Sequence, residues 1–378
     1  ATDGSLSWPP DDFQLEADPD AINGPSGSST QFGRSIAVSG DIAVVADPEY
    51  RNALGNLQPA VQVFNRLGST WIHGATLTSP IQDYSPLGET GNMEIDPDTG
   101  ERYYEPKSDE MDEFGTAVAT DGTTIVVGAP GGRLGVLPSA EVGRNDVPGV
   151  QHGVAYVFTN RGAGWALDKT LSPPSARDLG SADDVRFGAA VAVAGGLAVV
   201  GAPMFDGWGY ITNSDGVVDN DPFSRFRPGP KETLIDSGAA WVFGDLSSPC
   251  TREFACASES RLTGHRAGWF GVKPDESTAD PVWSDTGGQP GDHFGAAVAV
   301  SGGNVVVGAP DEELKDPVKA SRYGSVMWFT GNASAGTPDW EKDLSEFPWE
   351  YRSEFSGDSP DELFGYALAL SAVEAEPK

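Results

Sequence analysis

Basic residues are scarce in this chain. Its 378 residues include 24 Lys and Arg against 56 Asp and Glu, so the formal net charge is −32 at pH 7. Nucleic-acid binding and docking on anionic membranes both need clusters of basic side chains, so the sequence predicts neither partner. The sequence also lacks an apolar run of about 18 residues, and we therefore expect no transmembrane helix and no membrane insertion.

Residues with catalytic chemistry are few and follow no known motif. The chain has four histidines, which we interpret as loop or surface residues, and it lacks the metalloprotease motif, the nucleophile elbow and the phosphate-binding and dinucleotide-binding glycine loops. The sequence therefore predicts no enzyme. A glycan hydrolase or lyase that uses two carboxylates stays open, because 56 acidic residues place such pairs somewhere by composition alone.

Cysteine is nearly absent. Cys250 and Cys256 have five residues between them, which predicts a small-loop disulfide and an oxidising compartment, with half of a metal site near His265 as the alternative. Asn332 begins an Asn-Ala-Ser glycosylation sequon. Residues 1–4 lack the basic start of a signal peptide, so we expect either none or one already removed. These features favour a secreted, extracellular or cell-surface protein.

Glycine and proline are abundant, and many of them belong to an internal repeat. The pair Phe-Gly, followed by small apolar residues, begins at residues 32, 114, 187, 294 and 364. In the first four copies a second apolar run follows, ending in Gly-Ala-Pro or, in the first copy, Ala46-Asp47-Pro48. A third run with aromatic residues follows in each of these units, at residues 60–64, 154–158, 239–243 and 325–329. A fourth run that ends in Leu completes them, at residues 71–77, 165–171, 261–262 and, as a looser copy, 340–344.

Short runs rich in Val and aromatics, bounded by Gly, Pro and Asp, are typical of β-strands. Four such strands in each repeated unit predict a β-propeller. The first run alternates Ala with Val, as an innermost strand requires where blades crowd together. The second is continuous Val and is expected to be buried on both faces, while the aromatics of the third and fourth runs fill the widening gap between blades.

These motifs resemble the FG-GAP repeat of integrin α-subunit propellers, in the bacterial and algal integrin-α-like variety. The resemblance implies an all-β fold, a single β-propeller domain over residues 1–378 with four-stranded blades and, for a complete chain, seven of them. The fifth unit departs from the pattern because residues 371–374 replace its second strand. We expect residues 8–16 to supply a closing fourth strand, in an irregular five-bladed ring or in a chain that continues into further blades.

Three insertions interrupt the repeats, at residues 81–113, 204–237 and 264–293. In the first of them, Pro-Asp-Thr-Gly predicts an extra hairpin. Aromatic residues in polar loops are candidate contacts for a protein or a glycan, although they can equally pack the loops onto the ring. The candidates are Tyr103, Tyr104, Trp208, Tyr210, Phe223, Trp269 and Trp283.

Calcium sites need closely spaced oxygen ligands. The loops between first and second strands are too short and too poor in Asp for the calcium sites that the resemblance implies, so those sites are not carried over. Residues 213–221 offer oxygens at alternating positions, and we consider Ca²⁺ there on Asn213, Asp215, Asp219 and Asp221, with Asp96 and Asp98 as a weaker pair. A solvated acidic loop is the alternative, and no cofactor is required by the fold.

The sequence thus predicts a non-enzymatic extracellular module for cell-surface adhesion or extracellular assembly. It would bind protein or glycan at the cell surface, or assemble with itself, through the inserted loops. The carboxylate enzyme described above is one alternative. A spacer segment in a larger filament or surface-layer protein is another.

Overall fold

The computed structural model describes residues 31–50, 58–80, 92–95, 102–105, 112–132, 153–162, 164–172, 185–205, 207–212, 217–219, 231–234, 236–244, 246, 259–263, 291–312, 323–331, 349–357 and 363–370. These residues form strands and turns, with no helix among them. The expected all-β class is confirmed for this part of the chain.

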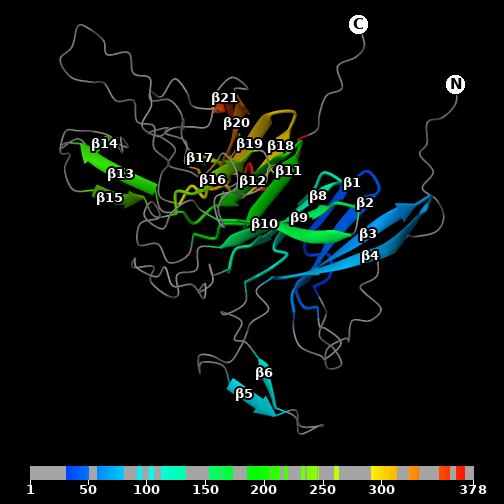
Figure 1. Cartoon of the computed structure of the whole chain (residues 1–378). Helices are drawn as coiled ribbons and strands as arrows, with labels where there is room; N and C mark the ends of the chain where they lie inside the picture. Colours follow the sequence, from blue (N-terminus) through cyan, green and yellow to red (C-terminus); the bar gives the residue numbers. More distant parts are fainter. Residues whose placement is uncertain are drawn as a thin grey trace, which may run out of the picture.

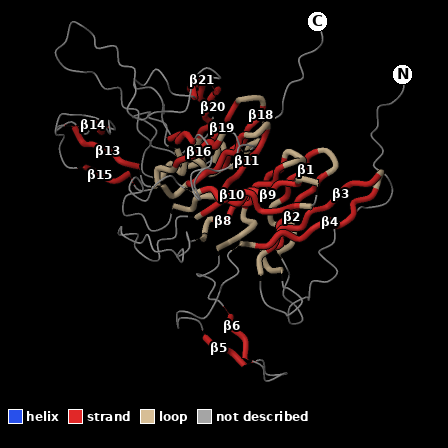
Figure 2. Tube along the Cα trace, in the orientation of Figure 1, coloured by secondary structure: helices blue, strands red, loops and turns tan. Residues whose placement is uncertain are grey.

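Four four-stranded antiparallel sheets make up most of the described chain (Figures 1 and 2). The first contains β1 (Ile36–Ser39), β2 (Ile42–Asp47), β3 (Ala60–Leu67) and β4 (Thr70–Thr78). The second contains β7 (Ala117–Thr120), β8 (Thr124–Ala129), β9 (Val154–Asn160) and β10 (Trp165–Leu171). The third contains β11 (Ala190–Ala194), β12 (Leu197–Ala202), β16 (Ala239–Phe243) and β17 (Glu259–Thr263). The fourth contains β18 (Ala297–Ser301), β19 (Asn304–Ala309), β20 (Ser325–Gly331) and β21 (Trp349–Ser356).

The sheets meet along their first strands. In every sheet the strand that follows Phe-Gly lies at one edge, and the second, third and fourth strands follow in chain order. β7 contacts both β1 and β11, and β11 also contacts β18. The small residues of these strands let the sheets approach closely, and the sheets follow one another in chain order from blue to orange in Figure 1. The predicted positions of the first, second and third strands are confirmed in all four sheets.

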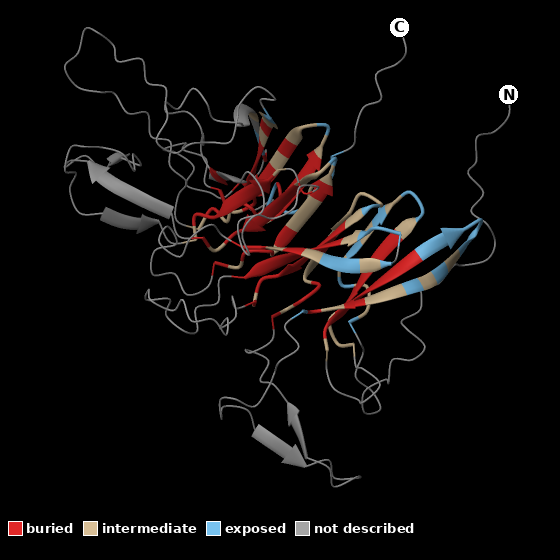
Figure 3. Ribbon diagram, viewed as in Figure 1, coloured by how far each residue is buried: buried red, intermediate tan, exposed pale blue. Residues whose placement is uncertain are grey.

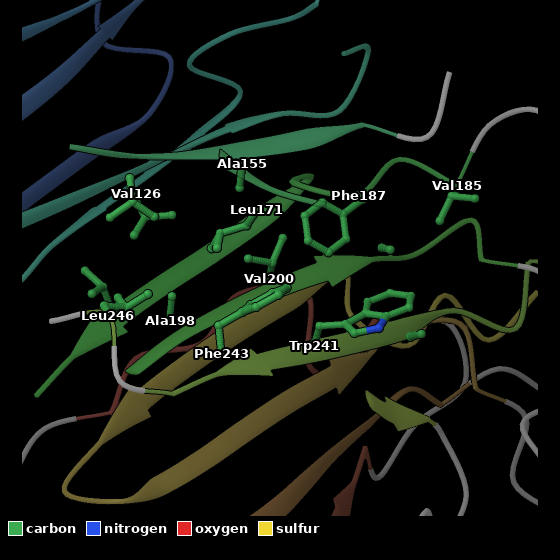
Figure 4. Close-up of a cluster of buried hydrophobic side chains, with 14 of the residues drawn as sticks. Val126, Ala155, Leu171, Val185, Phe187, Ala198, Val200, Trp241, Phe243 and Leu246 are labelled. Carbon is green, nitrogen blue, oxygen red and sulfur yellow. The ribbon is translucent and has the colours of Figure 1, made fainter. Parts of the chain in front are cut away.

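The core consists of the layers between consecutive sheets. The second strands β2, β8 and β12 are buried from their second residue onward, as their continuous apolar sequence predicts (Figure 3). One layer joins Val126 and Val157 of the second sheet to Val200 and Trp241 of the third (Figure 4). Equivalent layers lie between the first and second sheets and between the third and fourth.

Aromatic side chains fill these layers. Phe187 packs edge-on against Trp241 and Phe243 of its own sheet, with ring centroids 5.5 and 6.1 Å apart. Phe114 has the same relation to Phe158, and Phe294 to Phe329. The prediction that third-strand aromatics fill the gap between units is therefore confirmed.

Two predicted strands differ from the structure. The fourth strand of the fourth sheet is β21 at Trp349–Ser356, not residues 340–344, which lie outside the described residues. The Trp-to-Leu spacing predicted the wrong position for this strand because the loop before it is longer than in the other units. The Trp, Tyr and Phe residues of β21 provide the strand-forming sequence instead. Residues 366–370 of the fifth unit form no strand, although Phe364-Gly365 is in place. The expected closing strand at 8–16 lies outside the described residues.

Candidate functional site

Each Phe-Gly pair forms a tight turn that leads into a first strand. Gly115, Gly188 and Gly295 have φ values of +89°, +96° and +94°, in a region that residues with a Cβ avoid. The N–H of each donates to the carbonyl of the Gly-Ala-Pro glycine in its own unit, from Gly115 to Gly128, Gly188 to Gly201 and Gly295 to Gly308, at 2.9–3.0 Å. The two halves of the motif are therefore bonded to each other within one sheet.

The same Gly-Ala-Pro glycine also faces the Phe-Gly glycine of the next unit. A Cβ placed on Gly201 would lie 2.0 Å from the carbonyl oxygen of Gly295. The corresponding distance is 1.9 Å from Gly128 to Gly188 and 2.0 Å from Gly308 to Gly365. No side chain fits at these distances, so the motif glycine is required by the close approach of two backbones. We call this repeated arrangement the glycine contact.

The first unit shows why its sequence can depart from the motif. Ala46 stands at the glycine position and accepts a 2.9 Å hydrogen bond from the N–H of Gly33. A Cβ placed on Gly115 of the next unit would lie 3.2 Å from the methyl group of Ala46. The first two sheets are therefore spaced widely enough here for alanine, unlike the other pairs.

The acidic residue Asp112, two positions before Phe114, stabilises the turn that follows it. Asp112 is buried, its Oδ1 accepts a 3.1 Å hydrogen bond from the N–H of Phe114, and its Oδ2 accepts one from Ser79. Burial raises the pKa of Asp112, and these hydrogen bonds lower it. Asp112 therefore has a structural role in this turn. Asp292 is also buried, whereas Asp184, Asp361 and Glu362 lie outside the described residues.

An ion pair that the sequence reasoning missed links consecutive units. Glu113 and Arg186 each precede a Phe-Gly pair, and both have left-handed backbone with φ near +55°. The guanidinium of Arg186 donates to both carboxylate oxygens of Glu113, at 2.6 and 3.3 Å. Opposite charges at the same position of successive repeats were the available signal. Because the pair is partly exposed, its contribution to stability is about 1 kcal/mol or less.

A polar group lies on the outer face of the first sheet. Asp47 and Gln62 are buried, and Oε1 of Gln62 lies 2.7 Å from both Nε2 of His73 and Oγ1 of Thr76. The strand registers show which residues stand at these positions in other sheets. Asp47 corresponds to Ala129 of the second sheet and Ala202 of the third, and Gln62 corresponds to Tyr156 and Trp241. In those sheets this face packs against the preceding sheet. The departure from Gly-Ala-Pro at Asp47 was the sequence signal.

Asp47 makes stability depend on pH. Burial raises its pKa from 3.8 to about 6, Gln62 lowers it, and the nearby Glu49 raises it. Since the folded pKa exceeds the unfolded one, the contribution of Asp47 to stability is expected to fall as pH rises from about 4 to 6, by up to about 3 kcal/mol. Asp47→Asn is expected to remove this loss and to stabilise the protein at pH 7 by about 1–3 kcal/mol.

Urea unfolding of both proteins at pH 4 and pH 7 measures this effect. The difference in the free energy of unfolding between the variant and the natural protein should be much larger at pH 7 than at pH 4. An Asp47→Ala variant, which restores the alanine of the other units, serves as a second comparison. The same difference at both pH values would contradict the assignment to Asp47.

The described parts of the first and second insertions form small sheets of their own. The predicted hairpin is confirmed: β5 (Asn92–Ile95) pairs with β6 (Arg102–Glu105), and β6 carries Tyr103 and Tyr104. In the second insertion, β13 (Gly207–Thr212) pairs with β14 (Val217–Asp219) on one side and β15 (Lys231–Leu234) on the other. Both sheets are candidate binding surfaces because they are additions to the repeat.

The second insertion brings several candidate residues into one sheet. Trp208 and Tyr210 lie on β13, and Tyr210 is directly opposite Asp219 of β14 and Lys231 of β15. Of the calcium candidates, Asp219 is in this sheet, and Asn213, Asp215 and Asp221 lie outside the described residues. The remaining candidates also lie outside them: Phe223, Cys250, Cys256, Trp269, Trp283, Asn332, Asp96 and Asp98.

Within the described ranges, no group of three or more His, Cys, Asp or Glu side chains is placed to hold a metal ion. Nor do these ranges contain a helix long and apolar enough to cross a membrane.

The comparisons with known proteins agree with the repeat geometry. Residues 108–158 and 284–327 match the family model described as FG-GAP repeat. These two stretches contain the Phe-Gly turns at Phe114 and Phe294 and the second strands that follow them. No curated protein matches the chain. FG-GAP repeats are consistent with extracellular modules of the adhesion type and are typically not enzymes. Residues 108–158 and 284–327 are thus similar to FG-GAP repeats.

Proposed function

We propose that the chain is a non-enzymatic extracellular binding or structural module in which the four-stranded sheets are blades of a β-propeller. The observation that carries this proposal is the glycine contact, which relates the second, third and fourth sheets to the unit after each of them in the same way. A repeated step between sheets that meet at their first strands is how a radial array is built. FG-GAP repeats support the same architecture and an extracellular setting.

The first sheet also supports a larger array. Ile36 and Val38 of β1 are 57% and 60% exposed, whereas Val298 and Val300 at the equivalent positions of β18 are 8% and 7% exposed. On the later sheets this face is covered by the sheet before it. This exposed apolar face of β1 is therefore suited to packing against a neighbouring blade.

The inserted sheets would provide the binding surface. A rigid array of sheets with added loops separates the scaffold from the contact residues, which is how loop-borne binding sites are commonly arranged. Aromatic side chains contribute strongly to protein and glycan contacts, and β6 and β13 each carry two of them. A disulfide between Cys250 and Cys256, a glycan on Asn332 and Ca²⁺ at residues 213–221 belong to this proposal.

A binding assay on cell surfaces tests the function. The fluorescently labelled chain is titrated onto intact cells of its source organism and onto arrays of glycans, with calcium and with EDTA. We expect saturable binding that a Trp208→Ala, Tyr210→Ala double variant weakens at least about tenfold. Phe355→Ala, which changes an exposed aromatic of β21 outside the insertions, is the matched control and should bind normally.

Mass spectrometry of the glycans after incubation separates binding from catalysis. Glycans of unchanged mass are expected. Shortened products would contradict the non-enzymatic assignment, and equal binding by the double variant and the natural chain would contradict the placement of the surface on the second insertion.

A further inference from the structure

The small sheet of the second insertion has two faces of different chemistry. β13 is its central strand, between β14 and β15 (Figure 1). Residues two apart in a strand share a face, so Trp208 and Tyr210 lie on one face of β13, and Gly207 and Gly209 lie on the other. Both aromatic residues of this strand therefore belong to the same face, with a glycine between them in the sequence.

The strand registers add polar residues to this face. Tyr210 is directly opposite Asp219 of β14 and Lys231 of β15, and Trp208 is opposite Thr233. Residues directly opposite in antiparallel strands share a face and stand about 5 Å apart. A carboxylate accepts hydrogen bonds, an ammonium group donates them, and a hydroxyl group does both. We call the face that holds these five residues the aromatic face.

The opposite face of the same sheet is mainly aliphatic. Ile211 and Val218 are directly opposite each other on it, and Leu234 belongs to it at the far end of β15. Glu232 is its charged residue. Strand pairing therefore gathers the aromatic residues on one face only, together with hydrogen-bond donors and acceptors.

We propose that the aromatic face binds a neutral glycan, with sugar rings stacked on Trp208 and Tyr210. The inference rests on the proposed binding function of the inserted sheets and names the class of ligand. Sugar rings have apolar C–H faces that pack on aromatic rings, and their hydroxyl groups both donate and accept hydrogen bonds. Two residues along a strand span about 7 Å, so the two aromatic rings serve neighbouring sugars of one oligosaccharide.

The size of the sheet favours a glycan over a protein as the ligand. Its strands have six, three and four residues, and only alternate residues belong to one face. A stable protein–protein interface takes about 20–30 residues from each partner. A small ligand needs only a few apolar contacts and a small number of well-placed polar groups, which the aromatic face can supply.

The charge of the aromatic face favours a neutral glycan over an acidic one. Asp219 and Lys231 carry opposite charges and flank the same residue, Tyr210, so this face is neutral within a chain of net charge −32. A glycan with sulfate or carboxylate groups is repelled by the chain as a whole. A neutral glycan meets no such repulsion, and both charged groups can form strong hydrogen bonds with its hydroxyls.

Isothermal titration calorimetry of the full chain with neutral hexasaccharides of glucose, galactose, mannose, xylose and N-acetylglucosamine tests this inference. EDTA is present, so that Asp219 acts on the sugar and not through a metal ion. We expect saturable binding of at least one hexasaccharide, weakened at least about tenfold by Trp208→Ala and by Asp219→Ala. Trp208→Phe keeps an aromatic ring and should retain most of the affinity. Glu232→Ala makes the same acid-to-alanine change on the opposite face and is the matched control.

The results that overturn the glycan inference are distinct from those that overturn the proposed function. Absence of binding to every hexasaccharide overturns the inference, and so does equal weakening by Asp219→Ala and Glu232→Ala or tighter binding of the sulfated forms. Binding to source cells that survives removal of their glycans and still depends on Trp208 also overturns it, while the proposed function stands with a protein partner. Binding to a hexasaccharide without binding to cells would overturn the cell-surface function alone.

Discussion

Gly201→Ala is expected to lower the free energy of unfolding by about 3 kcal/mol or more. The added methyl group would lie 2.0 Å from the carbonyl oxygen of Gly295, which is backbone and cannot rotate away. The third and fourth sheets must separate to accept it, and the layer of buried side chains between them then loses its packing. Urea unfolding followed by tryptophan fluorescence measures the change.

Gly195→Ala is the matched control for this experiment. Gly195 lies in the turn between β11 and β12, with φ of +58° and open space where the Cβ would lie. Alanine there should lower the free energy of unfolding only by the left-handed backbone strain, about 1–2 kcal/mol. Equal losses at Gly195 and Gly201 would contradict the expectation that the contact between sheets makes Gly201 the more costly position.

Phe187→Ala is expected to destabilise the protein by about 3–5 kcal/mol. Phe187 is fully buried, and its ring lies between Trp241 and Phe243 in the layer shown in Figure 4. Removing it leaves a cavity in a layer that two sheets share, so the surrounding residues cannot collapse without moving a sheet. The free energy of unfolding is measured as for Gly201→Ala.

Phe32→Ala provides the internal comparison. Phe32 occupies the same position of the first repeat, but it is only half-buried and packs on Phe64 at 6.4 Å. Its removal should cost about 1–2 kcal/mol, since less apolar surface leaves the interior. A loss at Phe32 as large as that at Phe187 would contradict the view that burial between sheets sets the energetic role of the motif.

The strands of the four sheets could be predicted from the sequence because their signals are local. A run such as Val305-Val306-Val307 between turn residues specifies a buried strand without reference to the rest of the chain. Its repetition in phase then predicts the sheet order. The fourth strand of the fourth sheet was missed because its loop breaks the spacing on which the prediction relied.

The role of the Gly-Ala-Pro glycine could not be predicted in the same way. Within the sequence of one unit, Gly201 indicates only that a strand is ending. Its partner Gly295 is 94 residues later in the chain, and their contact exists only when two sheets have packed together. The pairing of Glu113 with Arg186 was hidden for the same reason.

The candidate site was predicted in outline only. Aromatic residues in the insertions were recognised by type, but the sequence did not indicate that Tyr210 would lie opposite Asp219 in a three-stranded sheet. Short strands in polar insertions carry weak periodicity, so their pairing is set by turns and cross-strand neighbours. Asp47 was noted as a departure from the motif, and its burial among Gln62 and Glu49 required the structure.

Hydrogen–deuterium exchange of the Phe-Gly turns most directly tests the claim that the turn of a complete unit is bonded to the second strand of its own sheet. The N–H groups of Gly115, Gly188 and Gly295 are expected to exchange slowly because each donates to a buried second strand. The N–H of Gly365, whose second strand is missing from the described residues, is expected to exchange much faster. Fast exchange at all of these glycines, or equal protection at Gly365 and Gly295 in the isolated monomer, would contradict this description.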